Sequence, residues 1–341
     1  MGSKQTSNPR ERGAVLLLML GLIFACTAMV AAFVQNSLSE IRRVGQSAQA
    51  IKLRPYAYSA LEVVMASIHE YQLLGESIQQ PESDWIHAIE VNDIDFPSDM
   101  EVTVEIEDIG QYIGLSTLTN STDWEAILED LDYSSFVSEP LIDAILDWVD
   151  SDDNRRPFGA EMEDYQNEGR TVLPPNGPIY GIEEFEDILG FEEIWWESPG
   201  QPSALAQRFR ALLTPLHGNP PNINTAALPV LSYLTGDEFM AQNILDYRNG
   251  PDGIAGTEDD ELFENQTELE RQGFRLERSA NYDAALLTIE ITILSGGARF
   301  QLSCLLSLDP SANDSEAVAS QGELSTLSIS EYSRFSTTGK L

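Results

Sequence analysis

Carboxylate side chains gather in one short stretch that follows an apolar segment ending at Trp148. Its acidic and amide residues are, in chain order, Asp150, Asp152, Asp153, Asn154, Glu161, Glu163 and Asp164. Calcium takes carboxylate and amide oxygens as ligands, and several of them in one loop can surround the ion. The stretch therefore predicts a calcium site, with candidate ligands Asp150, Asp152, Asp153, Glu161, Glu163 and Asp164. The alternative is a solvated acidic loop, which an acidic chain forms without binding metal.

The spacing of these residues resembles an EF-hand loop without completing one. Asp150, Asp152, Asn154 and Glu161 fall on the first, third, fifth and twelfth positions of such a loop. Its sharp turn requires glycine at the sixth position, where this chain has Arg155. A true EF-hand is therefore excluded.

The sequence contains no complete catalytic motif of the kinds considered below. His69-Glu70 begins like the motif of a zinc protease, but Leu73 stands where the second histidine is needed. The sequence has neither a nucleophile elbow nor a phosphate-binding loop, and its three histidines and two cysteines lack metal-ligand spacing. We expect a protein that is not an enzyme.

The net charge limits the classes of partner. The chain of 341 residues has 19 Lys and Arg against 56 Asp and Glu, a formal charge of -37. Affinity for nucleic acid depends largely on Lys and Arg that neutralise phosphates, so we expect no nucleic-acid partner. A second acidic stretch, residues 252–260, is interpreted as a solvated loop. Cys26 and Cys304 lie in different environments, so no disulfide is expected.

An uncharged segment covers residues 14–34, directly after Arg12 and Gly13. As a helix it would reach roughly 30 Å, the thickness of a bilayer's hydrocarbon core. Basic residues beside such a span are retained in the cytoplasm, and here Lys4, Arg10 and Arg12 precede it. The remainder of the chain is therefore expected outside the cytoplasm.

Three interpretations of this segment stay open. A cleaved secretory signal also has a basic start and small residues near its end, but its apolar part is usually about 7–15 residues long. A permanent membrane anchor is the second. The third is that the junction of Gly13 and Ala14 resembles the cleavage site of type IV prepilin-like proteins. That resemblance implies that a prepilin peptidase cuts after Gly13 and leaves Ala14 as the new N-terminus.

The chain after the span predicts one helix, then strands around a helical block. Residues 35–74 have helical spacing, and Pro55 is expected to kink or break that helix. Residues 101–109 alternate as a strand, while residues 286–294 and 299–308 flank a Gly-Gly pair and predict a hairpin. Between these strands, helical segments alternate with loops rich in proline, glycine and acidic residues.

We therefore predict an α+β fold. A long N-terminal transmembrane helix packs on a small antiparallel pilin-like sheet, with a large all-helical insertion. The expected parts are a leader (1–13), the N-terminal helix (14–75, with 14–34 in the membrane), a head (76–118 and 278–309), an inserted helical domain (119–277) and a flexible tail (310–341).

Four pieces of sequence, in their order along the chain, resemble the minor pseudopilin K family of type II secretion systems. They are the Arg12-Gly13-Ala14 junction, residues 141–150 with Asp152-Asp153 after them, Gly159-Ala160-Glu161 with Tyr165, and Asn222-Ile223-Asn224-Thr225-Ala226. Residues 241–248 look like that family's helix–hairpin–helix repeat. The hairpin itself, Thr235-Gly236-Asp237-Glu238, is acidic and departs from the Gly-rich turn of DNA-binding versions.

The resemblance implies a structural role in protein export. Members of this family form the tip of the pseudopilus with pseudopilins I and J and prime its assembly. They cross the bacterial inner membrane once, hold the C-terminal head in the periplasm and bind calcium in the helical domain. Leu18, the fifth residue after the cleavage site, stands where ordinary pilins carry a glutamate. A subunit without this buried charge fits the tip, where no neighbouring amine needs a partner.

Two other functions remain as alternatives. A minor pilin of a type IV pilus shares the leader and the helix but usually lacks the large helical insertion. A membrane-anchored, calcium-dependent binding module or enzyme would form no filament.

Overall fold

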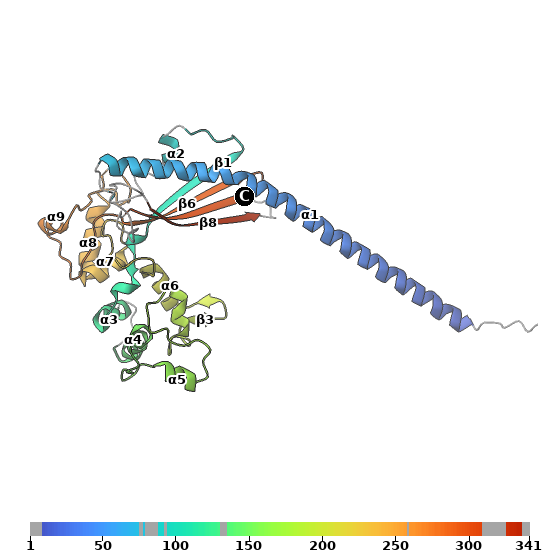
Figure 1. Cartoon of the computed structure of the whole chain (residues 1–341), viewed down its shortest axis with the longest axis horizontal. Helices are drawn as coiled ribbons and strands as arrows, with labels where there is room; N and C mark the ends of the chain where they lie inside the picture. Colours follow the sequence, from blue (N-terminus) through green and yellow to red (C-terminus); the bar gives the residue numbers. More distant parts are fainter. Residues whose placement is uncertain are drawn as a thin grey trace, which may run out of the picture.

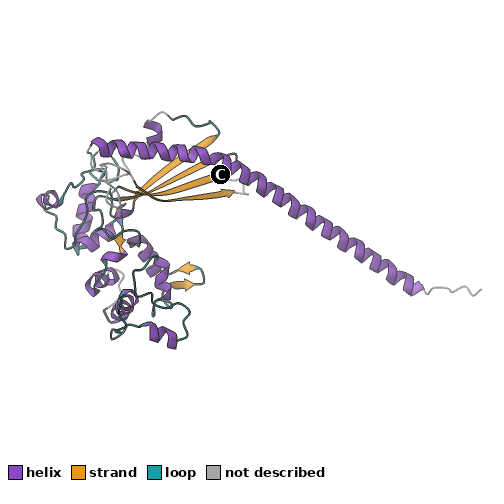
Figure 2. Ribbon diagram, viewed as in Figure 1, coloured by secondary structure: helices purple, strands orange, loops and turns teal. Residues whose placement is uncertain are grey.

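The computed structural model describes residues 9–74, 78, 88–91, 94–129, 135–257, 259–308 and 325–335. Within these ranges the chain forms one long helix, a four-stranded sheet and a block of short helices (Figures 1 and 2). The helices are α1 (Pro9–Leu74), α2 (Ala88–Val91), α3 (Ser121–Glu129), α4 (Ser135–Val149), α5 (Met162–Asn167), α6 (Ala204–Leu212), α7 (Leu228–Thr235), α8 (Glu238–Arg248) and α9 (Gln266–Arg271).

The strands and the short 3-10 turns complete the chain. The strands are β1 (Met100–Asp108), β2 (Ile113–Gly114), β3 (Trp196–Ser198), β4 (Gln201–Pro202), β5 (Leu213–Thr214), β6 (Leu286–Ser295), β7 (Ala298–Ser307) and β8 (Ser325–Phe335). The 3-10 turns are η1 (Ile109–Gln111), η2 (Leu115–Thr117) and η3 (Ile182–Asp187).

Helix α1 has two halves with opposite surroundings. Its N-terminal half protrudes from the rest of the molecule, and its apolar side chains from Met19 to Val34 are exposed (Figure 1). Met19–Ser37 is long and apolar enough to cross a membrane. No other helix among the described residues is. The C-terminal half lies along one face of the sheet and buries Leu53, Ala57, Ala60, Leu61, Val64 and Ile68.

Pro55 was expected to kink or break this helix; the break does not occur, because α1 continues through this residue to Leu74. A proline inside a helix removes one backbone hydrogen bond and crowds the preceding turn. Here Leu53 and Ala57, on either side of it, are held against the sheet, and this packing offsets the lost bond. Figure 1 shows that α1 changes direction along its length, and it does so without interruption.

The sheet has the strand order β1-β6-β7-β8, with every neighbouring pair antiparallel. Buried side chains alternate along β6, at Leu287, Ile289, Ile291 and Ile293, and join the same core as α1. Alternation of this kind is typical of a sheet with one face covered. The predicted α+β class, with a long helix on an antiparallel sheet, is confirmed.

Strand β8 differs from the expectation of a flexible tail over residues 310–341. Residues 325–335 pair with the whole length of β7, which otherwise would form an edge of the sheet. The serine-rich composition predicted flexibility, yet Leu327 and Ile329 alternate with Ser328 and Ser330 as in a strand. The tail prediction is corrected for these residues, and residues 309–324 and 336–341 lie outside the described part.

The helical block lies between β1 and β6 in the sequence and at one end of the sheet in space (Figure 1). Its core is separate from that of the sheet and centres on aromatic side chains. Phe185 contacts Trp195 and Phe209, with ring centroids 5.8 and 4.9 Å apart. Trp195 is fully buried, as expected for a packing residue, whereas Trp196 remains 36% exposed.

A buried carboxylate joins the block to the sheet. Asp108, the last residue of β1, accepts hydrogen bonds from Asn222 Nδ2 at 2.8 Å, Thr225 Oγ1 at 2.7 Å and Gly110 N at 2.8 Å. Burial raises the pKa of Asp108, and these three donors oppose that rise. Asn224 completes the junction through Nδ2 bonds of 2.8 Å to the carbonyls of Phe263 and Tyr282. The Asn222-Ile223-Asn224-Thr225 motif thus fixes the block on the strand.

Ile289→Ala tests the packing of α1 on the sheet. Ile289 is fully buried between the strands and the helix, so truncation removes buried carbon and leaves a cavity. We expect a loss of about 2–5 kcal/mol in the free energy of unfolding, measured by denaturant titration. Thr292→Ala in the same strand, at a half-buried position, is the control and should cost much less. Equal effects would contradict the described packing.

Candidate metal centre

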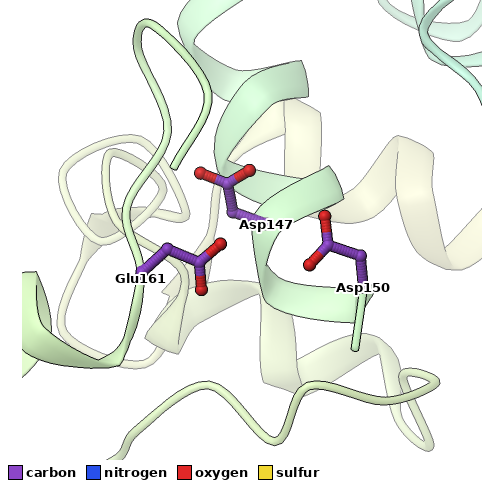
Figure 3. Close-up of side chains that lie close together, drawn as sticks. All are labelled: Asp147, Asp150 and Glu161. Atoms are coloured by element: carbon purple, nitrogen blue, oxygen red, sulfur yellow. The ribbon is translucent and has the colours of Figure 1, made fainter. Parts of the chain in front are cut away.

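Three carboxylates converge where α4 ends. Oxygen atoms of Asp147, Asp150 and Glu161 lie within 4.8 Å of one another, and Figure 3 shows the three side chains close together. Asp147 lies in the last turn of α4, Asp150 directly follows that helix, and Glu161 precedes α5. The i, i+3 spacing puts Asp147 and Asp150 on one side of α4.

Glu161 has the fewest hydrogen-bond partners of the three carboxylates. It is only 4% exposed, and neither of its carboxylate oxygens has a hydrogen-bond partner among the described residues. Asp150 Oδ1 is also buried without a partner there. Burial first, then the charges of Asp147, Asp150, Asp153 and Asp152, raise the pKa of Glu161 to about 7. Because unpaired buried charge is costly, the site fits a hard cation that takes oxygen ligands.

Arg156 supplies part of the positive charge. Its Nη1 lies 2.5 Å from Asp147 Oδ1 and 2.5 Å from Asp150 Oδ2, and its backbone N–H donates to Asp147 Oδ2 at 3.1 Å. Burial nevertheless raises the pKa of Asp147, whose side chain is completely buried. Arg156 forms no hydrogen bond or ion pair with Glu161, so this third carboxylate lacks a counter-ion among the described residues.

The remaining predicted ligands have other partners. Asp152 Oδ1 accepts from Asn154 N at 2.8 Å, and Asp153 Oδ1 accepts from the amide of Asn176 at 3.3 Å. Asp164 pairs with Arg155 at 3.1 Å and accepts from the backbone N–H of Glu161 at 3.0 Å. Glu163 is exposed in the first turn of α5. The structure therefore brings Asp150 and Glu161 together, with Asp152 and Asp153 near enough to act through their charges.

Asp147 was absent from the predicted ligands, although a signal for it exists. It lies inside the apolar run of residues 141–149, where an acidic residue on the buried side of a helix is unusual. One turn separates it from Asp150, so helical spacing alone places both carboxylates on the same side. A search for acidic residues at i, i+3 across the end of the helix would have found it.

Gly159 allows the loop to pass close to Asp147. A Cβ atom at this position would overlap the carboxylate of Asp147 and crowd the carbonyl of Asp143. The neighbouring residues fix the same segment, since Phe158 N donates to Asp143 Oδ2 at 3.1 Å. Tyr165 then packs on Trp148, with ring centroids 5.6 Å apart. The Gly159-Ala160-Glu161 motif with Tyr165 thus docks the loop on α4.

The second acidic stretch is satisfied within itself. Asp252 Oδ1 accepts from Ile254 N at 2.8 Å, and Asp260 Oδ2 accepts from Gly256 N at 2.7 Å. A hydrogen bond from Thr257 lowers the pKa of Asp259. These contacts fit the solvated loop expected there.

The proposed processing residues lie in the first turns of α1. Gly13, Ala14 and Leu18 belong to the helix by their backbone, and their side chains lie outside the described part of the structure. The cleavage site and the role of Leu18 stay predictions.

The middle of the chain is similar to a known protein family. Residues 116–198, which contain all three carboxylates, match the family model described as Type II secretion system (T2SS), protein K. The predicted resemblance to the protein K family is confirmed. The matched residues, referred to below as the protein K domain, begin next to β2, before α3, and end at β3, and they include the three carboxylates.

A solved structure supports the same fold over most of the chain. It is a chain of the crystal structure of the GspK-GspI-GspJ complex from the type 2 secretion system of enterotoxigenic Escherichia coli. The two chains share 16% sequence identity with a TM-score of 0.53, over 85% of this chain and 99% of that one. The match covers far more of the chain than residues 116–198 alone. No curated protein matches the chain significantly.

Gly159→Ala tests the close approach of the loop to Asp147. The added methyl group must push the loop or the carboxylate aside, so we expect the free energy of unfolding to fall by about 1–3 kcal/mol. Gly177→Ala is the matched control, because a Cβ there meets only the carbonyl of Pro175, at 3.7 Å. It should leave stability unchanged or slightly raised. Thermal or denaturant unfolding of both variants measures the difference.

Glu161→Gln tests the raised pKa of Glu161 in a metal-free buffer. The folded-state pKa of about 7 exceeds the ordinary value of 4.5, so the folded protein binds this proton more tightly than the unfolded chain. The associated stability is complete below the unfolded pKa and is lost as the pH rises through about 7. With chelator present, the native protein should lose more unfolding free energy than Glu161→Gln between these values. Parallel pH profiles would contradict the assignment.

Proposed function

We propose that this protein is a minor pseudopilin of a type II secretion system. It forms the tip of the pseudopilus with pseudopilins I and J and primes assembly of the filament for protein export. The observation that carries the proposal is the position of the protein K domain. That domain is inserted between two neighbouring strands of a sheet which packs on the end of a long apolar helix.

Helix α1 supports the membrane part of this proposal. Met19–Ser37 crosses the inner membrane, with the basic leader in the cytoplasm and the head in the periplasm. The prepilin peptidase cuts after Gly13, and Ala14 becomes the N-terminus of a helix that keeps its apolar half. The same exposed side chains that contact lipid then pack against other subunits, so the helix passes from membrane to filament without becoming exposed to water.

The helical block supports a position at the tip. It lies at the end of the sheet that is remote from the protruding half of α1 (Figure 1). In a filament of parallel subunits this is the end that faces the next subunit, and the bulk of the block would obstruct one placed there. Leu18 stands where ordinary pilins carry a buried glutamate. A subunit that lacks this charge fits the tip, because no subunit above it offers an amine that the charge would have to neutralise.

A structural calcium ion fits the protein K domain. Asp147, Asp150 and Glu161 would hold it, with Asp152 and Asp153 adding negative charge nearby. When bound, the ion supplies the positive charge that Glu161 lacks among the described residues. These residues join the end of α4 to the segment before α5, so the ion would fix two parts of the domain together.

Removal of calcium should lower the stability of the protein K domain. A ligand present at about 100 times its Kd stabilises the folded state by about 2.7 kcal/mol, so chelator should lower the melting temperature measurably. Glu161→Gln should abolish this calcium-dependent shift, because it removes a buried ligand. Glu163→Gln, two residues away and exposed, is the control and should retain the shift. An unchanged melting temperature on adding chelator would contradict the calcium proposal.

Co-purification from the native bacterium tests the pseudopilin role. The tagged protein should bring down pseudopilins I and J from detergent-solubilised inner membranes, as the subunits of the similar complex assemble with one another. A control variant has residues 14–34 replaced by leucines, which preserves membrane insertion but changes the surface that meets other helices. It should recover less of both partners. Absence of I and J from cells that express them would contradict the proposed role.

A further inference from the structure

The helix–hairpin–helix element borders a pocket outside the metal centre. The pocket has a volume of about 380 Å³, toward the lower end of the range for sites that hold a small ligand or a single side chain. Its apolar floor is formed by Ile113, Ile127 and Leu212, all buried in the core of the block. The walls come from α3, from the α7–α8 hairpin and from the segment that follows α9.

Carboxylates from three separate elements line the pocket. Glu125 comes from α3, Glu238 from the start of α8 and Glu277 from the segment after α9, and all three are exposed. Among the described residues that line the pocket, the one cation is Arg278, which already has partners. Its Nη1 donates to the carbonyl of Tyr233 at 2.6 Å, and its guanidinium lies 4.3 Å from the centre of the Tyr233 ring. The pocket is therefore electronegative around an apolar floor.

Asp123 neutralises most of the positive charge that Arg278 brings to the pocket. The two side chains form an ion pair of 3.6 Å in which both are mostly buried. The exposed carboxylates of Glu125 and Glu277, which line the same pocket, disfavour the binding of a second anion there. Long-range electrostatics strengthen this preference, because the chain as a whole carries a formal charge of -37.

Acidic side chains at the hairpin oppose the binding of phosphate. Asp237 caps α8, accepting from Phe239 N at 2.8 Å and from Met240 N at 3.4 Å, so two of the backbone donors that attract anions are occupied. The Glu277 carboxylate lies against Gly236, where even a Cβ atom would overlap it. A motif that contacts nucleic acid in other proteins here presents acidic groups.

We propose that this pocket receives an arginine side chain from a protein partner. The aliphatic part of arginine can lie on Ile113, Ile127 and Leu212, while the guanidinium meets the carboxylates that line the pocket. Arginine fits better than lysine because its planar group donates in several directions, matching acceptors that come from different elements. This inference rests on the pocket alone and stands independently of the calcium site and of the filament role.

Binding of a short peptide to the purified full-length protein in detergent tests the proposal. The probe is fluorescently labelled Leu-Arg-Leu amide, and the reference is the same peptide with citrulline, which keeps the shape of arginine without its charge. Fluorescence anisotropy should give tighter binding for the arginine peptide. The double variant Glu125→Gln/Glu277→Gln should weaken that binding by about fivefold or more, from the loss of two ion pairs.

A matched variant separates the pocket from the general acidity of the chain. Glu193→Gln/Glu197→Gln removes the same charge from exposed positions outside the pocket and should retain binding. If the first double variant unfolds at a lower temperature than the native protein, Glu238→Gln alone serves in its place. Absence of arginine-peptide binding, equal binding of the citrulline peptide, or equal losses in the two double variants would overturn the proposal. Displacement of the peptide by inorganic phosphate at matched ionic strength would also overturn it.

Discussion

The structure depends on one helix whose two halves lie in different surroundings. Helix α1 is continuous over 66 residues, and its N-terminal half exposes apolar side chains that only lipid or other helices can cover. Its C-terminal half packs against the sheet, with Ala57, Ala60 and Val64 completely buried. Because the two halves belong to one continuous helix, the head is joined directly to the apolar half. A protein with this constraint can be held in a membrane and then incorporated into a helical filament as a single unit.

The sheet explains how a large insertion is compatible with that rod. β1 and β6 are antiparallel neighbours, and Asp108 at the end of β1 lies opposite Leu287 near the start of β6. The chain can therefore leave the sheet and return at the same end without disturbing its register. Asp108 and Asn222 tie the inserted block to this point. The carboxylate group of Asp147, Asp150 and Glu161 lies elsewhere in the block, between the end of α4 and the start of α5, and so is separate from this junction.

The sequence predicted those features that repeat along the chain. Alternating residues in β1, β6 and β7 and the helical spacing of α1 were sufficient for the fold, because burial of one face imposes a period. Asp150 and Glu161 were predicted from ligand chemistry. Asp147 was missed because it interrupts an apolar run, and β8 was missed because its many serines resemble a flexible tail. Both depend on contacts outside their own element, with Arg156 in the following loop in one case and with the edge of β7 in the other.

The mature N-terminus tests most directly whether α1 is a helix destined for a filament. Intact-mass and N-terminal sequencing of the protein from its native membrane should give a chain that begins at Ala14, with the apolar half of α1 retained. A strain without prepilin peptidase should give the uncleaved chain. A mature protein that begins after Ala32, or one that keeps Met1 in cells with active peptidase, would contradict the account.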